Sequence, residues 1–175
     1  KIPEDCSLLI LNGPSSDITE EEKETITSYL ASGGKVFLLL GEAREDTPNL
    51  DGLMKEYGME QEKGYIADMQ RSYQGNYYYI FPVLDASSGL TEGMSSDMVM
   101  LVNAHGMNMS DPVRDTITTT PFMTTSSDGY AVTEDNQKQG TYTLGAVATE
   151  TVGDEEARFT VISAGTLIDS QVTDA

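Results

Sequence analysis

A short strand, a helix and a second strand follow one another within residues 6–41, and this unit most constrains what the chain can fold into. Residues 6–11 form an almost continuous apolar run that ends at an Asn-Gly-Pro turn, and residues 35–41 form a second run. Such runs are typical of strands that are buried on both faces of a parallel sheet. We therefore predict two parallel strands joined by a right-handed helical crossover.

The helix between these two strands has recognisable ends. Thr19 is followed three residues later by Glu22, which matches a capping box. The glutamates at 20–22 also suit the positive end of the helix dipole. Gly33 and Gly34 end the helix, since glycine adopts the left-handed conformation at little cost. The helix ends predicted in this way lie between the two apolar runs.

Weaker patterns predict the remaining elements. The predicted elements are a helix over 50–57, strands over 64–68, 77–84, 97–103, 141–151 and 158–165, and the beginning of a helix over 166–170. The last two strands are separated by a short turn, which favours an antiparallel hairpin. Residues 107–140 are rich in threonine and serine without a helical period, so we expect an irregular insertion of short strands and loops. The whole chain, residues 1–175, is expected to be one α/β domain with a mostly parallel sheet.

The charge balance excludes several classes of function. The chain has 29 Asp and Glu residues against 10 Lys and Arg residues, which gives a formal net charge of −19. Nucleic-acid binding requires clustered cations, so it is excluded. An anionic bilayer surface would repel the chain. No run of about 18 apolar residues is present. We expect the sequence to be a piece of a longer protein, in which any membrane anchor lies in other segments.

No signature of catalysis or of nucleotide binding occurs in the sequence. A dinucleotide fingerprint, a P-loop and a G-x-S-x-G motif are all absent. The loop after the first strand contains Pro14, which lacks an N–H, and Asp17, which would repel phosphate. Cys6 is the only cysteine and lies at the entry of the first strand, the wrong end of the sheet for a nucleophile. His105 is the only histidine and follows a predicted strand, where a loop or cap role is favoured.

No metal site and no cofactor are predicted. A single cysteine cannot form a cysteine-based zinc site or an internal disulfide framework, and no EF-hand calcium loop is present. Glu42 and Glu45 lie near the exit of the second strand with Asp46 and form the best placed acidic group, although a polar loop is the favoured interpretation. Tyr77 and Tyr79 could line a sugar pocket, although alternate tyrosines of one strand ordinarily face the core.

Ligands of open α/β sheets bind outside the carboxyl ends of the strands. We therefore take residues at those ends, or in the loops that follow them, as candidates for contact with a ligand or a partner, and we assign no catalytic residue. These candidates are Asn12, Ser15, Glu42, His105 and Thr166.

Several motifs together resemble a known family. A strand preceded by P-x-D and followed by G-P leads into an acidic helix, and Y-L-x-x-G-G then leads into the next strand. In these features the chain resembles the extracytoplasmic domain of ABC-type transport auxiliary proteins, the gliding-motility GldG-like group. Residues 121–126, 144–148 and 158–168 are similar to later segments of the family. The matching residues of the opening are Pro3, Asp5, Leu9, Gly13, Pro14, Glu21, Tyr29, Leu30, Gly33, Gly34 and Lys35.

The resemblance implies a flavodoxin-like or class I glutamine-amidotransferase-like layered domain without catalytic residues, a domain type that also occurs in intraflagellar-transport proteins. It implies ABC permease and ATPase subunits, or other membrane-complex proteins, as partners. It places the domain on the extracytoplasmic side of a bacterial cell membrane, held by flanking transmembrane helices. We expect a non-catalytic interaction domain. Two alternatives stay open: a hydrolase-like enzyme that uses His105, and a domain that binds a sugar or another small ligand at the strand carboxyl ends.

Overall fold

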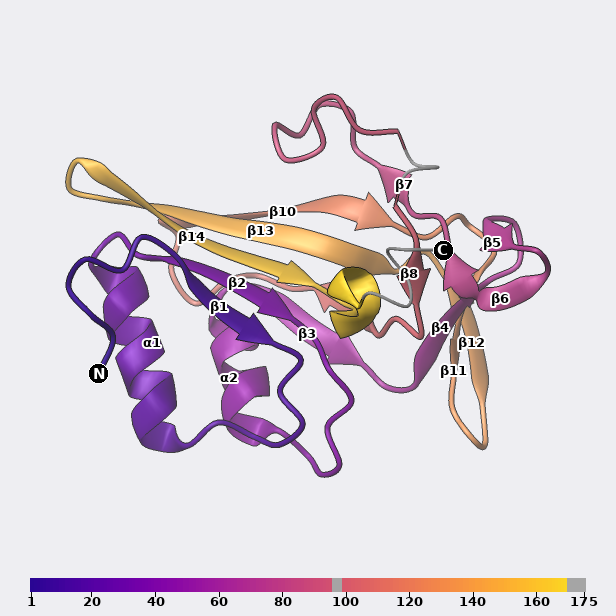
Figure 1. The fold of residues 1–175 in the computed structure, drawn as a ribbon, viewed down its shortest axis with the longest axis horizontal. Helices are drawn as coiled ribbons and strands as arrows, with labels where there is room; N and C mark the ends of the chain where they lie inside the picture. The colour runs from indigo at the N-terminus through magenta and orange to yellow at the C-terminus, as the bar shows by residue number, and fades with distance from the viewer. Residues whose placement is uncertain (96–98, 170–175) are drawn as a thin grey trace.

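The computed structural model describes residues 1–95 and 99–169, and it contains the strand–helix–strand unit (Figure 1). Strands β1 (Leu9–Asn12) and β2 (Lys35–Leu39) pair in parallel. Helix α1 (Glu20–Ala31) connects them and packs beneath the sheet. The predicted βαβ unit is therefore confirmed.

The predicted ends of α1 are also confirmed. The Glu22 N–H donates to Thr19 Oγ1 at 3.2 Å, and the Thr19 N–H donates to Glu22 Oε2 at 2.8 Å. These hydrogen bonds from Thr19 hold the pKa of Glu22 below its ordinary value. Gly33 follows the helix with a φ of +88°, a conformation that favours glycine. Local chemistry thus sets both ends of α1.

The predicted fold class is wrong, because the structure is mostly β with mixed and antiparallel sheets rather than a mostly parallel α/β layered fold. The main sheet has the strand order β1-β2-β14-β13-β10-β7. Strand β14 (Glu155–Ile162) pairs in parallel with β2, whereas β13 (Thr143–Val152), β10 (Ile117–Thr124) and β7 (Val83–Leu84) continue the sheet with antiparallel pairings. The predicted C-terminal hairpin is present as β13 and β14.

The lack of further crossover helices explains this difference. Each additional parallel strand requires a connection of a dozen or more residues, usually a helix. Among the described residues only α2 (Pro48–Glu56) follows β2 as an α-helix, and the strands beyond it return as antiparallel neighbours. The remaining described strands and the final 3₁₀ turn are β3 (Met59–Glu62), β4 (Tyr65–Asp68), β5 (Ser72–Tyr73), β6 (Asn76–Ile80), β8 (Leu101–Val102), β9 (Gly106–Met109), β11 (Gly129–Val132), β12 (Gln137–Gly140) and η2 (Gly165–Ile168).

Three predicted segments differ in detail from the structure. The strand expected over 77–84 is divided between β6 and β7, which belong to different sheets. The strand expected over 97–103 is represented by β8, and its first two residues lie outside the described part of the chain. Residues 107–140, expected as an irregular insertion, contain β10, which pairs with β13 inside the main sheet.

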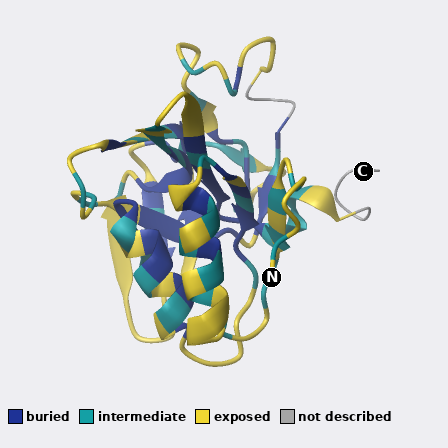
Figure 2. Cartoon of the chain, turned by 90° about the vertical axis from the view of Figure 1, so that its left-hand side faces the viewer, coloured by how far each residue is buried: buried dark blue, intermediate teal, exposed yellow. Residues whose placement is uncertain are grey.

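Apolar side chains form a core on each face of the main sheet. One core packs α1 and α2 against the sheet through residues such as Leu30, Leu53 and Phe159. The other core lies on the opposite face and contains Leu101 and Leu144. Figure 2 shows the buried residues between the helices and the strands. The sheet therefore lies between two apolar layers along its central part.

The first strand is buried on one face only, which corrects the prediction of a strand buried on both. Leu9 and Leu11 pack against the helix-side core. Leu8 and Ile10 point to the other side and are 50% and 54% exposed. The physical reason is position, since β1 is the edge strand and the second core does not extend over it.

A fully buried carboxylate joins the end of β4 to the loop before β11, which is far away in sequence. Asp68 lies at the end of β4 and has no exposed surface. Its Oδ1 accepts hydrogen bonds from the N–H groups of Gln70 and Arg71, both at 3.0 Å, and from Ser126 Oγ at 2.7 Å. Its Oδ2 accepts from the Ser126 N–H at 2.7 Å. Four donors thus compensate for the burial of the charge.

A partly buried ion pair ties β13 to the segment before β10. Arg114 Nη2 lies 2.9 Å from Glu150 Oε2, and the guanidinium stands 5.5 Å from the Tyr57 ring centroid. Hydrogen bonding from Arg114 lowers the pKa of Glu150, with burial acting in the opposite direction. Thr116 Oγ1 also donates to this carboxylate. The pair therefore stabilises the fold only while Glu150 is ionised.

We predict that Asp68→Asn lowers the free energy of unfolding by about 2–3 kcal/mol, because the new amide places an NH₂ group against N–H and O–H donors. Urea unfolding of both proteins measures the difference. Asp115→Asn, at an exposed position with no hydrogen bond in the described structure, is the control and should change stability little. Equal stability of the Asp68 variant and the wild type would contradict this account.

We predict that Glu150→Gln costs about 0.5–1 kcal/mol at neutral pH. A lowered pKa contributes stability above the ordinary glutamate value of 4.5, and that contribution is lost as the pH falls through the lowered pKa. The stability difference between wild type and variant should therefore shrink below pH 4.5 in urea titrations. Glu134→Gln, in an exposed turn, provides the control. A difference that stays constant into acid would refute the ion-pair explanation.

Candidate functional site

The carboxyl ends of the parallel strands β1, β2 and β14 open into a cleft of about 300 Å³. Four of the five candidate residues line it: Asn12, Glu42, His105 and Thr166. Ser15 does not line it, and its carbonyl instead accepts a hydrogen bond from the Arg44 N–H at 3.2 Å. The structure thus brings together candidates from the ends of four different strands or from the segments that follow them, while their role in binding remains a prediction.

Glycines form the floor of this cleft. A Cβ atom on Gly41 would lie 2.5 Å from the carbonyl carbon of Gly13, so this close approach of the two strand ends requires glycine at position 41. Gly13 has a φ of +57°. The Gly165 N–H donates to the Leu40 carbonyl at 2.6 Å, which fixes η2 over the same point. Gly41 and Gly165 were not among the predicted site residues, although each is the last residue of a predicted strand.

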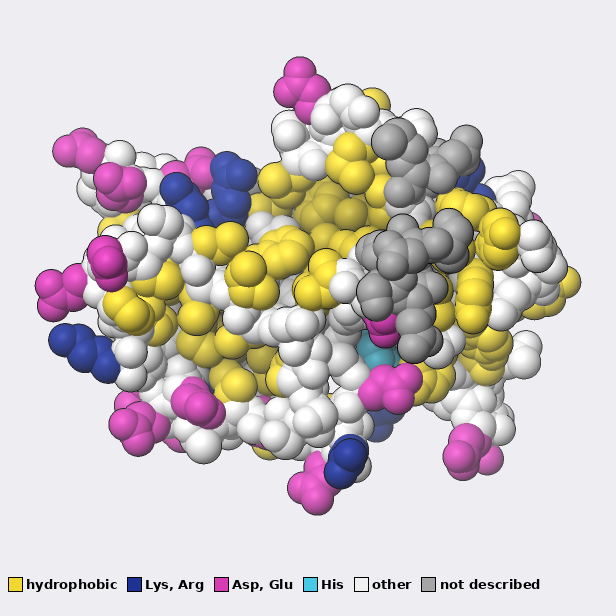
Figure 3. Space-filling view, in the orientation of Figure 1, with side chains coloured by type: hydrophobic (Ala, Val, Ile, Leu, Met, Phe, Trp, Pro, Cys, Tyr) yellow, Lys and Arg dark blue, Asp and Glu magenta, His cyan; other side chains and the backbone are white. Residues whose placement is uncertain are grey.

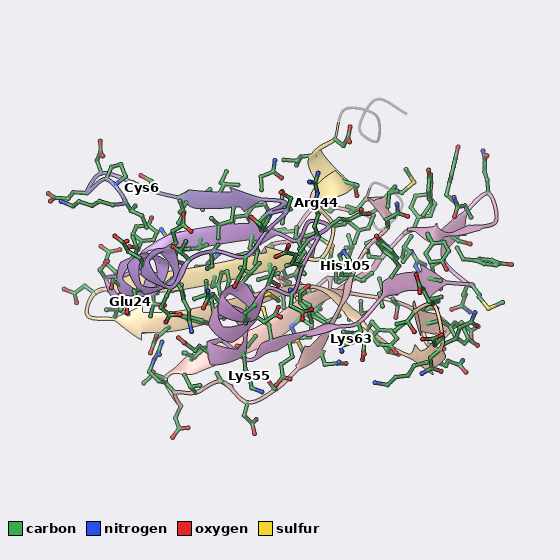
Figure 4. The ribbon with its side chains drawn as sticks, turned by 90° about the horizontal axis from the view of Figure 1, so that it is seen from below. Cys6, Glu24, Arg44, Lys55, Lys63 and His105 are labelled. Carbon is green, nitrogen blue, oxygen red and sulfur yellow. The ribbon has the colours of Figure 1, made fainter. Side chains whose placement is uncertain are left out.

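His105 is half-buried and is held mainly by backbone contacts. Its N–H donates to the Ser163 carbonyl at 2.9 Å, and its Nδ1 lies 3.2 Å from the Gly64 carbonyl. Because a carbonyl oxygen can only accept, Nδ1 carries the proton in this contact, and Nε2 of the neutral ring is an acceptor. Figure 4 shows His105 at the cleft end of the sheet, with Cys6 at the opposite end. The two residues therefore cannot act together.

Tyr65 connects the imidazole to the acidic side of the cleft. Its ring centroid lies 5.2 Å from that of His105, with an interplanar angle of 30°. A side-chain hydrogen bond with Glu42, followed by burial, raises the pKa of the Tyr65 hydroxyl. The phenol therefore stays protonated at neutral pH and donates to the carboxylate. Sequence reasoning missed Tyr65, because nothing in its spacing indicates that it meets residues 23 and 40 positions away.

Hydrogen bonds to backbone atoms hold two polar side chains of the cleft, those of His105 and Thr166. The described hydrogen bonds of His105 reach backbone atoms and not a carboxylate or a hydroxyl. Thr166 Oγ1 donates to the Val102 carbonyl at 2.7 Å and so fastens η2 to β8. Within residues 1–95 and 99–169, no group of three His, Cys, Asp or Glu side chains is placed to hold a metal ion.

Two other hollows help to locate the candidate site. A cavity of about 120 Å³ adjoins the cleft and shares Leu40, Gly41 and His105 with it. A larger hollow of about 960 Å³ lies at the other end of the sheet, between residues 1–7 and α1. We favour the cleft of about 300 Å³ over the larger hollow, because ligands of parallel strands bind at their carboxyl ends. Neither Tyr77 nor Tyr79 lines these hollows, so they give no support to a tyrosine-lined pocket.

Comparison with known proteins identifies relatives of the chain. A family model described as "ABC-type uncharacterized transport system" matches residues 1–173. A solved structure described as "mmIFT52 N-terminal domain" matches with a TM-score of 0.65 and 20% sequence identity, over 94% of this chain and 68% of that chain. The second match shows a shared fold. No curated protein matches the chain. Among the described residues, no helix is both long and apolar enough to cross a lipid bilayer.

We predict that Thr166→Val loosens one wall of the cleft. The Val102 carbonyl loses its hydroxyl partner, which costs about 1 kcal/mol. Amide hydrogen exchange should become faster at Leu167 and Asp169, whose N–H groups depend on η2, while the core strands stay protected. Thr151→Val, on an exposed strand position, is the control. Unchanged exchange in η2 would show that this hydroxyl does not hold the turn.

Proposed function

The chain belongs to this family of ABC-type transport-system proteins, and from that premise we propose that it is a non-catalytic interaction domain. It is an auxiliary part of the transport system, and it binds other components of that system rather than transforming a substrate. The observation that carries the proposal is the family match over residues 1–173, which includes every described strand and the whole cleft.

The finer proposal is that the domain works on the extracytoplasmic side of a bacterial membrane, as in gliding-motility-like systems, and contacts the ABC permease and its ATPase complex. The resemblance of the first 41 residues to GldG-like domains supports this placement. The net charge of −19 supports contact with proteins rather than with anionic lipid headgroups. Flanking transmembrane helices would hold the domain at the membrane.

The arrangement around His105 supports a role without catalysis. A hydrolase of this kind needs a nucleophile and an orienting carboxylate within hydrogen-bond reach of the imidazole. The imidazole instead donates to the Gly64 carbonyl and stands against Tyr65. The carboxylate of Glu42 interacts with the phenol of Tyr65. The polar groups of the cleft are therefore positioned for binding.

A second candidate function is small-ligand binding in the same cleft. Asn12, Glu42 and His105 are polar residues that line a hollow of about 300 Å³. Pockets with a few convergent polar groups are typical of small-ligand sites. A sugar or another polar molecule is the ligand class that these groups would suit. This function is compatible with an auxiliary domain that also contacts a permease.

The test uses the full-length protein in the membranes of its native host. A photoreactive amino acid at Glu42, on the rim of the cleft, should cross-link to the permease of the ABC system. The same amino acid at Val113, which is 61% exposed and lies near the end of α2, should give no such product. Mass spectrometry identifies the cross-linked protein, and protease protection in sealed vesicles reports the side of the membrane.

A cross-link to the permease from Glu42 alone would support the proposal. Equal cross-linking from both positions, or protection of the domain on the cytoplasmic side, would contradict it. The second candidate function would be favoured by two results together. They are the absence of a protein cross-link from the cleft and amide shifts at Asn12 and Glu42 when a sugar is added.

A further inference from the structure

The outer edge of β1 has unused backbone groups. The Gly13 N–H donates to the Leu39 carbonyl of β2. Alternate residues of a strand direct their backbone groups to the same side, so this bond shows which residues of β1 face β2. Leu9 and Leu11 therefore direct their N–H and C=O groups toward β2. The same groups of Leu8, Ile10 and Asn12 point away from the sheet. Since β1 pairs only with β2 among the described strands, these groups form an open edge.

The side chains of the same residues lie on a sheet face that the second core covers only in part. Paired residues of neighbouring strands share a face, and the register joins Ile10 to Phe37, Phe37 to Thr160, and Thr160 to Val147. Ile10 is 54% exposed, and Phe37 and Val147 are half-buried. Figure 3 shows hydrophobic side chains gathered across the middle of this face. We call Leu8, Ile10, Phe37 and Val147 the edge patch.

A basic pair lies beside the edge patch, which is unusual in so acidic a chain. Lys35 and Arg158 are paired residues, two positions before Phe37 and Thr160, so both share the face of the patch. Arg158 is paired with Glu156 at 2.6 Å. No ion pair joins Lys35 to another described residue. The local charge therefore favours a carboxylate next to apolar side chains.

We propose that the outer edge of β1 is a docking site for an extended segment of a partner protein, which adds to the sheet as a further strand. The segment places an apolar side chain opposite Ile10 and, two residues along, an acidic side chain that reaches Lys35. Backbone pairing with Leu8, Ile10 and Asn12 supplies affinity, and the two side-chain positions supply specificity. This surface shares only Asn12 with the cleft, and the proposal does not rest on the role of the cleft.

A second copy of the chain fits this edge less well. Self-pairing through β1 would bring together two molecules that each carry a net charge of −19. It would also bring the Lys35 side chain of each copy onto the joined face. An acidic–apolar strand from another protein satisfies both the open edge and the basic pair.

The test uses the chain with two fluorescent synthetic peptides. The first is Thr-Val-Thr-Glu-Thr-Val-Thr, whose valines and glutamate share one face, and in the second a lysine replaces the glutamate. Fluorescence anisotropy measures their dissociation constants at physiological salt. We expect the glutamate peptide to bind more tightly. Amide shifts in the NMR spectrum of the bound chain should be largest at Leu8, Ile10 and Asn12.

Variants separate backbone pairing from side-chain contact. Ile10→Pro removes an outward N–H while the bonds of β1 to β2 remain, because edge strands tolerate proline on the solvent side. Ile10→Thr keeps the N–H and removes apolar area, which should weaken binding about tenfold. Lys35→Gln should weaken binding of the glutamate peptide by up to about fivefold and should not weaken binding of the lysine peptide. Val113→Thr changes another exposed apolar residue and should have no effect.

Four results would overturn the proposal. They are no binding at millimolar peptide, equal binding by wild type and Ile10→Pro with both shown to be folded by urea titration, tighter binding of the lysine peptide, and a dimer in sedimentation that Ile10→Pro dissociates. The last result would assign the edge to a second copy. Cross-linking from the cleft to the permease, or its absence, would not alter any of these outcomes.

Discussion

The parallel pairing of β1, β2 and β14 is the constraint on which the rest of the structure depends. It brings three strand carboxyl ends to one edge, where Gly13, Gly41 and Gly165 allow the backbones to meet closely. The polar side chains of the cleft belong to strand ends or to the segments that follow them. The same pairing leaves β1 at the margin of the sheet, with one row of its hydrogen-bonding groups unused. Cleft and edge are thus two consequences of one arrangement.

Local chemistry made the first quarter of the fold predictable. The capping pair of Thr19 and Glu22, the glutamates that follow, and the glycines after α1 act over three or four residues, so they can be recognised in the sequence. The two apolar runs on either side complete a unit with few alternative arrangements. The gathering of Asn12, Glu42, His105 and Thr166 in one cleft follows from the same reasoning about strand ends.

The direction of later strands could not be predicted, because it depends on contacts across long sequence separations. Asp68 and Ser126 are 58 residues apart, yet their hydrogen bonds position β4 against the loop before β11. The threonines of β10 have no periodicity that distinguishes a central strand from a loop. The partial exposure of β1 could not be predicted either, since an apolar run indicates burial but does not show whether both faces of the strand are covered. For the same reason Tyr65 could not be placed beside His105.

Amide hydrogen exchange of the free chain tests the central claim most directly. If β1 is an edge strand paired only with β2, protection should alternate along it, with slow exchange at Leu9, Leu11 and Gly13 and fast exchange at Leu8, Ile10 and Asn12. This alternation would show both that the outer edge of β1 is open and which of its residues direct their N–H groups toward β2. Uniform protection along β1, or protection at Ile10 and Asn12 alone, would contradict the account.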